Sequence, residues 1–407
     1  MTDAAKLNRA LVDLVVASHI ARLEDLPRMV AEHAGAAGLR DVVFFVADLQ
    51  GKVLRQITGR GLDAGEGGTE YAVGGTVPGL AYRRVDLIAE PGGHPDEPGL
   101  RRWWMPVTDG VERLGVLRAD TDLEGEAVRD ALYALASVVA LLLLSKRAFS
   151  DSYARLVRTE AMSVSAEMQW HLTPPSAFAG AGTTVAALSE PAYEVGGDAF
   201  DYAVADSVLH MAVFDAMGHD ATAGLTANMA IGACRNARRQ GADLVGTSRA
   251  IEDTLIAQFG HSRYVTGVLA DLDMRTGALT WINRGHHLPV LLRAGRWSRE
   301  LYCPPAGPMG TGLGLPVTVS REQLEPGDRI ILYTDGIVEA RNDKGEEFGL
   351  QRFTDYIVRH NADGLTVHET LRQLVHAVVD QHAGHLVDDA TVLLAEWLDP
   401  DQDGLLP

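Results

Sequence analysis

The first 150 residues alternate between helical and strand-like hydrophobic patterns. Apolar residues recur at helical spacing over Leu11–Ala36, and this pattern ends near two glycines, Gly35 and Gly38. The run Asp41–Leu49 is mostly apolar and rich in β-branched and aromatic residues, which predicts a buried strand. The chain therefore begins with a helix that leads into a sheet.

A hairpin and a closing helix follow. Strand-like segments at Met105–Thr108 and Leu114–Ala119 flank Asp109-Gly110, a dipeptide typical of tight hairpin turns. Glu126–Leu144 has the pattern of a helix. Residues 1–146 are therefore expected to form one mixed α/β domain.

A narrow apolar stripe marks residues 147–175. Apolar residues recur three or four positions apart, with charged residues between them, and proline at 174 and 175 should end the helix. Such a stripe predicts a coiled-coil linker that joins two copies into a homodimer, although a helix lying on its own domain would give the same pattern. The stripe consists of Phe149, Tyr153, Val157, Ala161, Val164, Met168 and Leu172.

Residues 176–399 place acidic residues at the ends of predicted strands. Glycine-rich or turn-like sequence adjoins most of these positions, so each carboxylate could also belong to an ordinary turn. Converging carboxylates would repel one another unless a cation lay between them, and oxygen ligands favour Mg²⁺ or Mn²⁺ over Zn²⁺. Two such ions can activate a water molecule and orient a phosphoryl group. The acidic positions are Asp198, Asp215, Asp335, Asp388 and Asp389.

The same segment resembles the bacterial PPM/PP2C-type protein phosphatases of the SpoIIE and RsbU group. The matching stretches occur in the family's order and cover nearly all of residues 190–397: EVGGDAFDY (194–202), VFDAMGHD (213–220), YVTGVLADLD (264–273), WINRGHHLPVLL (281–292), LEPGDRIILYTDGIVEARNDKGEEFG (324–349) and DDATVLLAEW (388–397). The resemblance implies an αββα sandwich with metal ions between the sheets at one end. The fold class expected for the whole chain is α+β.

The resemblance also implies site residues. Asp198, Asp215, Asp335 and Asp388 match the family's catalytic metal-binding aspartates. Ala216 matches the position whose backbone carbonyl binds a metal, and Asp389 lies beside these ligands. The cofactor implied is Mn²⁺ or Mg²⁺, as two ions, with a third left open.

Several residues depart from the family pattern or have roles that the pattern leaves open. Asp220 stands where glycine is usual, and Arg284 and His287 replace the small residue and the proline of the NAGHPP pattern. Asn283, Gly285 and His286 match the family's N-x-G-H stretch; they either support the site or form a capped turn. His219 is either a general acid or a packing residue.

Residues 1–146 resemble a GAF domain, which implies a dimer platform or a small-molecule sensor. The matching stretches are LPRMVAEHAGAAGL (26–39), VVFFVADLQGKVL (42–54) and RRWWMPVTDGVERLGVLRAD (101–120). Trp103 and Trp104 either line a ligand pocket or are ordinary strand residues. A signal from this domain is expected to act through the linker on two helices beside the metal site, Ala221–Gln240 and Thr247–Phe259.

Composition narrows the function further. The 407 residues carry a formal net charge of -19, which disfavours nucleic acid and anionic lipid as partners. The two cysteines, Cys234 and Cys303, are far apart and exclude a disulfide framework. Residues 1–14 have no secretory h-region, and the apolar run Ala131–Leu144 is shorter than the roughly 20 residues that span a bilayer. A cytoplasmic protein without membrane insertion is expected.

Together these observations predict a metal-dependent protein serine/threonine phosphatase controlled by an N-terminal GAF-like domain. The resemblance implies that its substrate is a phosphorylated bacterial regulator, an anti-anti-sigma-factor-like (STAS) protein. The alternative is a sensory dimer or binding module whose phosphatase fold is weakly active or inactive. A nuclease is disfavoured because the chain is acidic and lacks basic tracts.

Overall fold

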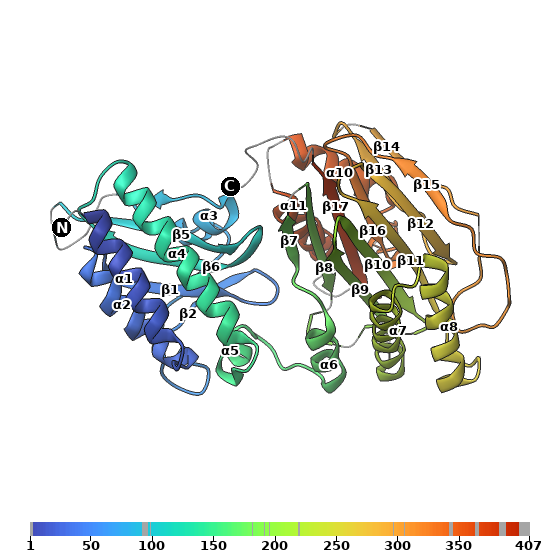
Figure 1. The fold of residues 1–407 in the computed structure, drawn as a ribbon, viewed down its shortest axis with the longest axis horizontal. Helices are drawn as coiled ribbons and strands as arrows, with labels where there is room; N and C mark the ends of the chain where they lie inside the picture. The colour runs from blue at the N-terminus through green and yellow to red at the C-terminus, as the bar shows by residue number, and fades with distance from the viewer. Residues whose placement is uncertain are drawn as a thin grey trace. The chain divides into compact units, whose positions relative to one another are not determined.

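The computed structural model describes residues 3–91, 97, 99–180, 182–190, 192–194, 196–218, 220–295, 297–304, 306–341, 345–362, 366–381 and 388–398. The chain forms two compact units, which divide between Ala161 and Met162. This division lies inside the predicted linker, 147–175. Figure 1 shows the elements of both units.

The N-terminal unit is a six-stranded antiparallel sheet covered by helices. Its strand order is β3-β2-β1-β6-β5-β4, and the predicted hairpin is present as β5 and β6, where Asp109 pairs with Glu112. The elements are α1 (Asp3–Ser18), η1 (Leu23–Asp25), α2 (Leu26–Ala36), β1 (Arg40–Ala47), β2 (Val53–Gln56), β3 (Glu70–Ala72), α3 (Val77–Arg84), β4 (Ile88–Ala89), β5 (Arg101–Asp109), β6 (Glu112–Thr121), α4 (Glu126–Arg147) and α5 (Asp151–Leu156).

The single helix predicted over Leu11–Ala36 is wrong, because the chain forms α1 and α2 with a break between them. Pro27 lies in the first turn of α2, where its missing amide hydrogen costs nothing. Proline is common in the first turn of a helix and unfavourable further along it, so Pro27 favours a helix that starts at this point.

The apolar run Ala131–Leu144 lies within α4, which packs against β5 and α1. By length and composition α4 is the one helix in the described residues that could cross a membrane, and half of its most apolar window is buried. That burial is what a core helix requires. In the same unit Trp104 packs in the core with Phe45 and Tyr71, and its indole nitrogen donates a hydrogen bond to Glu90 at 3.0 Å.

The C-terminal unit is a sandwich of two antiparallel sheets between two layers of helices. One sheet has the order β15-β12-β11-β10-β9 and the other β14-β13-β16-β17-β8-β7. Its elements are α6 (Val164–Leu172), β7 (Ala177–Gly180), β8 (Thr183–Glu190), β9 (Asp198–Ala205), β10 (Val208–Ala216), α7 (Ala221–Arg239), α8 (Leu244–Phe259), β11 (Val265–Asp273), β12 (Ala278–Arg284), β13 (Val290–Arg293), β14 (Trp297–Glu300), β15 (Ser320–Gln323), β16 (Arg329–Tyr333), α9 (Asp335–Val338), α10 (Leu350–Ala362), α11 (Val367–Gln381) and β17 (Ala390–Trp397).

Three hydrophobic cores hold these layers together. The central core lies between the two sheets and includes Phe200, Met211, Trp281 and Leu393. A second core joins the five-stranded sheet to α7 and α8, and a third joins the six-stranded sheet to α10 and α11. The layers are therefore helix, sheet, sheet and helix, as the resemblance implies (Figure 1).

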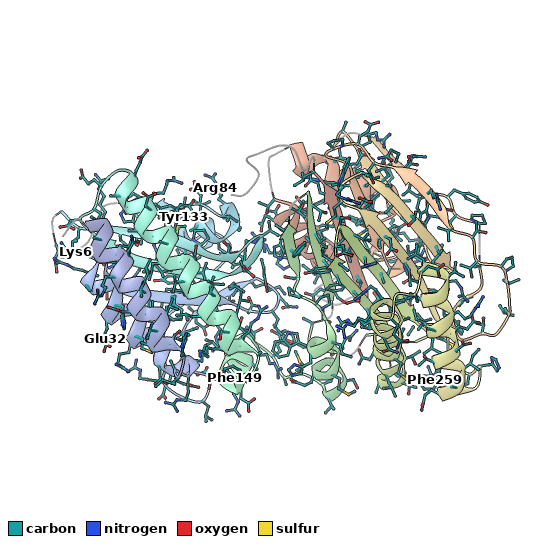
Figure 2. The ribbon with its side chains drawn as sticks, viewed as in Figure 1. Lys6, Glu32, Arg84, Tyr133, Phe149 and Phe259 are labelled. Atoms are coloured by element: carbon teal, nitrogen blue, oxygen red, sulfur yellow. The ribbon has the colours of Figure 1, made fainter. Side chains whose placement is uncertain are left out.

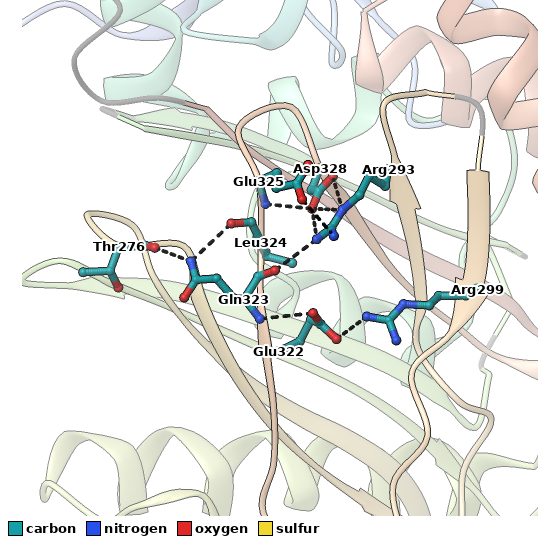
Figure 3. A network of polar contacts seen from close by, with 8 residues as sticks. All are labelled: Thr276, Arg293, Arg299, Glu322, Gln323, Leu324, Glu325 and Asp328. Atoms are coloured by element: carbon teal, nitrogen blue, oxygen red, sulfur yellow. Dashed lines mark hydrogen bonds and ion pairs between the residues drawn. The ribbon is translucent and has the colours of Figure 1, made fainter.

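Polar contacts tie the two sheets together at one end of the sandwich (Figure 3). Arg293 of β13 donates hydrogen bonds to the buried carboxylate of Asp328, and to the carbonyl oxygen of Gln323 in β15 at 3.0 Å. Arg299 of β14 pairs with Glu322 of β15. Strand direction places these residues at the end opposite the predicted aspartate site, since β10, β12 and β16 all run from this end toward the other.

The continuous helix predicted over 147–175 is wrong. Within 147–175, only α5 and α6 are helical after the end of α4, and the residues between Leu156 and Val164 are not. The stripe is divided as well: Tyr153 and Val157 are buried in the N-terminal unit, whereas Phe149, just after α4, is 71% exposed (Figure 2). Ser150 and Ser163 each cap a new helix through their side chains, which explains the restarts. The predicted dimer contact along a continuous linker helix therefore lacks the helix that it requires.

Candidate active site

Asp198 and Asp215 face each other across neighbouring strands. β9 begins at Asp198, β10 ends one residue after Asp215, and the two residues are direct partners in the antiparallel register. Phe200 and Val213, two positions away on the respective strands, belong to the core between the sheets. Because residues two apart share one face of a strand, both carboxylates point into the end of the space between the sheets.

Two glycines leave room for a third carboxylate, Asp389. Its Oδ2 accepts a hydrogen bond from the backbone N–H of Gly197 at 2.5 Å, and the residue is buried. A Cβ at Gly196 would lie 2.5 Å from Asp389 Cγ, and a Cβ at Gly197 would lie 2.6 Å from the carbonyl oxygen of Ala216. The Gly-Gly pair before Asp198 is therefore required by the close approach of these segments.

Thr334 connects the end of β16 to Asp198. Its buried hydroxyl donates a hydrogen bond to Asp198 Oδ2 at 2.5 Å and accepts one from the N–H of Thr391 at 2.9 Å. A Cβ at Gly336 would lie 1.8 Å from the carbonyl oxygen of Asp389. In the sequence Thr-Asp-Gly, the threonine holds Asp198 and the glycine lets α9 approach the start of β17. Asp335 between them is partly exposed.

The remaining predicted residues complete the cluster. Asp388 is exposed, and its Oδ1 accepts a hydrogen bond from the N–H of Asp389 at 2.9 Å. Ala216 buries its side chain in the core beneath α7, and its N–H donates to the carbonyl oxygen of Gly197 at 2.9 Å. The structure therefore brings every predicted acidic site residue to one end of the sandwich. His219 lies outside the described residues.

Burial and mutual repulsion raise the pKa values of two of these aspartates. Burial raises the pKa of Asp215 to about 7, and the charges of Asp335, Asp388 and Asp389 add to the shift. Burial also raises the pKa of Asp198 well above its usual range, although the Thr334 hydroxyl opposes this and Asp215 strengthens it. Ionisation of these carboxylates in the folded protein therefore costs free energy unless a cation is bound.

The donor set fits divalent cations. Among the described residues, no lysine or arginine forms an ion pair with Asp198, Asp215, Asp335 or Asp388. Converging carboxylates without a counter-charge are the hard oxygen donors that Mg²⁺ and Mn²⁺ bind. A cation between them would relieve the repulsion that raises the pKa of Asp215.

Comparison with known proteins identifies the domain. The family model of stage II sporulation protein E (SpoIIE) matches residues 205–398. This part of the chain is a PP2C-type serine/threonine phosphatase domain of the SpoIIE family. The match contains Asp215, Asp335, Asp388 and Asp389, and it begins shortly after Asp198.

Individual relatives are distant. Protein IcfG of Synechocystis is 24% identical over 135 residues, which are 32% of this chain and 21% of that protein, so the chain spans about a fifth of its length. The RsbU and RsbW domains of a Mycobacterium tuberculosis protein are 25% identical, with a TM-score of 0.46 over 54% of this chain and 61% of that one. The SiaA-PP2C domain of Pseudomonas aeruginosa is 22% identical, with a TM-score of 0.46 over 53% of this chain and 86% of that one. The identification rests on the family match.

In the phosphatase domain, the partly buried side chain of His286 links two strands. Its Nε2 lies 3.0 Å from the carbonyl oxygen of Tyr333 and must donate to it, so Nδ1, at 2.8 Å from the Thr266 hydroxyl, is the acceptor. Burial lowers the pKa of His286 to about 4, so the ring is neutral at neutral pH. As a neutral ring, His286 therefore connects Thr266, the strand partner of Asp215, to the end of β16.

Asn283 makes the turn that carries this histidine. Its side chain accepts the N–H of His286 at 2.8 Å and donates to the carbonyl oxygen of the same residue at 2.8 Å. Asn283 thus caps the turn, and His286 on this turn bonds to Thr266, which lies opposite Asp215. The two roles that the sequence left open for the N-x-G-H stretch are therefore compatible.

Sequence reasoning missed three residues that contact the site. Thr334 was part of the Thr-Asp-Gly match, but its bond to Asp198 depends on a pairing of distant strands. Thr266 lies opposite Asp215 on β11, with its hydroxyl 3.5 Å from Asp215 Oδ2. Gln169 of α6 donates a hydrogen bond to the backbone carbonyl of Asp198. No local pattern marks Gln169, because the spacing of the apolar residues around it carries no information about polar contacts.

Proposed function

We propose that the chain is a metal-dependent protein phosphatase that hydrolyses phosphoserine or phosphothreonine on a bacterial regulatory protein. The observation that carries this proposal is the convergence of Asp198, Asp215, Asp335 and Asp388 at one end of a SpoIIE-type domain. The substrate class, an anti-anti-sigma-factor-like (STAS) phosphoprotein, follows from the resemblance to the RsbU group. The reaction would take place in the cytoplasm.

The acidic cluster would hold two Mg²⁺ or Mn²⁺ ions. Asp198, Asp215, Asp335 and Asp388 would supply carboxylate ligands, Ala216 its backbone carbonyl, and Asp389 would lie beside them. When bound, such ions activate water and neutralise phosphoryl oxygens. Among proteins of similar fold, RsbX has been solved in complex with magnesium and PstP with two manganese ions.

The protein's own contribution is to fix the donors before the substrate arrives. The Thr334 hydroxyl holds one oxygen of Asp198, and the Gly197 N–H holds one oxygen of Asp389. Asp215, with its pKa near 7, would exchange a proton for a cation on binding. Rigid placement of charged groups is the term that dominates phosphoryl-transfer catalysis.

The N-terminal unit would control the phosphatase as a GAF-like sensor and dimer platform. α6 is the first helix of the C-terminal unit after the boundary, and it contacts both the site and the helix α7. Gln169 bonds to the carbonyl of Asp198, and Arg235 of α7 donates to the carbonyl oxygen of Leu172 at 2.6 Å. A shift of α6 would therefore move the backbone at Asp198 and the helix α7 together. A difference of a few kcal/mol between two positions of α6 is enough for such control.

The test is phosphate release by the full chain from a phosphoserine-containing STAS protein and from a small phosphoester. Turnover is expected with Mn²⁺, and loss of turnover with a chelator or with Asp335→Ala. Asp253→Ala is the matched control, because Asp253 is an exposed aspartate on α8, away from the cluster. Folded wild-type protein that hydrolyses neither substrate with Mn²⁺ would contradict the proposal.

The regulatory part has its own test. Gln169→Ala should change the Mn²⁺ concentration that gives half-maximal turnover, because it frees the backbone at Asp198. Val164→Ala is a suitable control on the same helix, since Val164 is 81% exposed. Equal metal dependence in wild type and Gln169→Ala would contradict the role of α6 and leave the phosphatase assignment intact.

A further inference from the structure

Three side chains with metal-binding atoms converge beside the aspartate cluster. They are His287, Asp335 and Glu339, and one ligand atom of each lies within 4.8 Å of those of the other two. In the described part of the chain, neither carboxylate accepts a hydrogen bond or forms an ion pair, and the His287 imidazole makes no hydrogen bond. Three side chains whose metal-binding atoms lie this close together form a potential ligand set.

The fold fixes the position of His287. The Asn283 side chain donates a hydrogen bond to the carbonyl oxygen of His287 at 3.2 Å, which fixes the backbone of the turn after β12. The ring stacks on Tyr333, with centroids 5.5 Å apart and planes at 25°. A stacked ring loses little further rotamer freedom when it binds an ion, so the imidazole is already ordered for ligation.

The two carboxylates come from consecutive turns of one short helix. Asp335 is the first residue of α9, and Glu339 directly follows its last residue. The N–H of Glu339 donates a hydrogen bond to the carbonyl oxygen of Asp335 at 2.8 Å. Residues four apart lie on the same side of a helix, so both carboxylates are presented to His287.

From this geometry we propose that His287, Asp335 and Glu339 bind a transition-metal ion such as Mn²⁺ or Zn²⁺. An imidazole with two carboxylates suits these ions, whereas Mg²⁺ prefers oxygen ligands and keeps its waters. His287 stands where the SpoIIE and RsbU pattern has proline, which has no side-chain ligand. The proposed site therefore depends on a residue that departs from the family pattern. It includes a nitrogen ligand, whereas the aspartate cluster offers only oxygen ligands.

The site shares one residue with the cluster of aspartates. Asp335 acts electrostatically on Asp215, so an ion held by His287 and Glu339 would also change the charge that Asp215 experiences. Coupling of two binding sites through one residue is reciprocal. The supply of a transition metal would thus alter the affinity of the aspartate cluster for its own ions.

The experiment measures ion binding by the metal-free full chain, with Co²⁺ as the probe and Mg²⁺ in excess. Wild type should retain an equivalent of Co²⁺ that Mg²⁺ does not displace, with a visible spectrum typical of imidazole ligation. His287→Phe keeps the stacking on Tyr333 but has no ligand nitrogen, and should weaken this binding by at least about tenfold. His19→Asn is the matched control, because His19 is an exposed histidine of the N-terminal unit.

Undiminished Mg²⁺-resistant Co²⁺ binding in folded His287→Phe would overturn the proposal. If that variant does not fold, Glu339→Gln decides, since Glu339 is exposed and has no partner in the described residues to lose. The assay needs no turnover, so failure of this site and failure of the phosphatase assignment are separate results.

Discussion

Two buried aspartates on strand β9 have opposite surroundings. Asp201 is 1% exposed, and its carboxylate accepts hydrogen bonds from Arg235 at 2.7 Å and from Arg238 at 2.9 Å, both on α7. Asp198 is 3% exposed, accepts a hydroxyl hydrogen bond from Thr334, and lies among other carboxylates. The two residues are three positions apart, so they lie on opposite faces of the strand.

The comparison separates a structural carboxylate from one poised for a ligand. A buried charge needs a partner, and Asp201 has two guanidinium groups within the fold. Asp198 has no cationic partner among the described residues, and its pKa is raised. Burial alone does not distinguish the two residues; the sign of the neighbouring charges does.

The largest effect is expected from Asp198→Asn. The substitution keeps the shape and the Thr334 contact but removes charge from the cluster, and turnover with Mn²⁺ should fall by about 10³-fold or more, because metal ligation supplies several kcal/mol to the transition state. Phosphate release checks this, and the unfolding midpoint of the metal-free protein should not fall. A loss of less than about tenfold would mean that Asp198 holds no ion.

Asp201→Asn should have the reverse profile. It leaves two guanidinium groups without their counter-charge and should lower the free energy of unfolding by about 3–5 kcal/mol. Urea denaturation in the presence of chelator measures this, with Asp198→Asn as the matched variant on the same strand. Equal stability of the two variants would show that the ion pairs of Asp201 do not stabilise the fold.

A smaller effect is expected from pH in the metal-free protein. The pKa of Asp215 is about 7 in the folded state, against an ordinary value of 3.8, so the folded state binds more protons between these values. Stability contributed by this group is therefore present at low pH and is lost as pH rises from about 4 to 7. Asp215→Asn should flatten this part of the curve, and saturating Mg²⁺ should do the same in wild type. A curve as steep in the variant as in wild type would exclude Asp215 as the source.

The smallest effect is expected from the surface pair of Arg263 and Asp220. Their charged atoms lie 3.5 Å apart, and the Asp220 side chain is 58% exposed. Asp220→Asn keeps a helix-capping side chain at the start of α7 and should leave the midpoint of urea denaturation nearly unchanged, because solvent screens an exposed ion pair. A cost near that of Asp201→Asn would show that exposure does not weaken ion pairs in this domain.

Local signals identified the acidic positions but not their contacts. Asp198, Asp215 and Asp335 follow glycines or apolar strands, and these patterns are visible within a few residues. The register that pairs Asp198 with Asp215, and the bond from Thr334 to Asp198, depend on segments far apart in the chain. Only the family resemblance predicted the convergence, because it carries the fold with it.

Helix continuity was the least predictable feature. The apolar spacing over 147–175 is the same for one long helix and for two short helices in different units. Capping serines at 150 and 163 were the available sign of two restarts. Likewise Pro27 signalled the start of α2, but the apolar pattern on both sides of it suggested one helix.

The contact between Gln169 and the carbonyl of Asp198 determines where this chain can be divided. A fragment that starts at residue 176 would keep every acidic residue of the cluster yet lack α6. A fragment that starts at residue 162 would keep the helix and its bond to the strand. Chimaeras that place a different sensor before the phosphatase should therefore be joined ahead of α6, and shorter grafts would transfer the acidic residues without the contact that supports them.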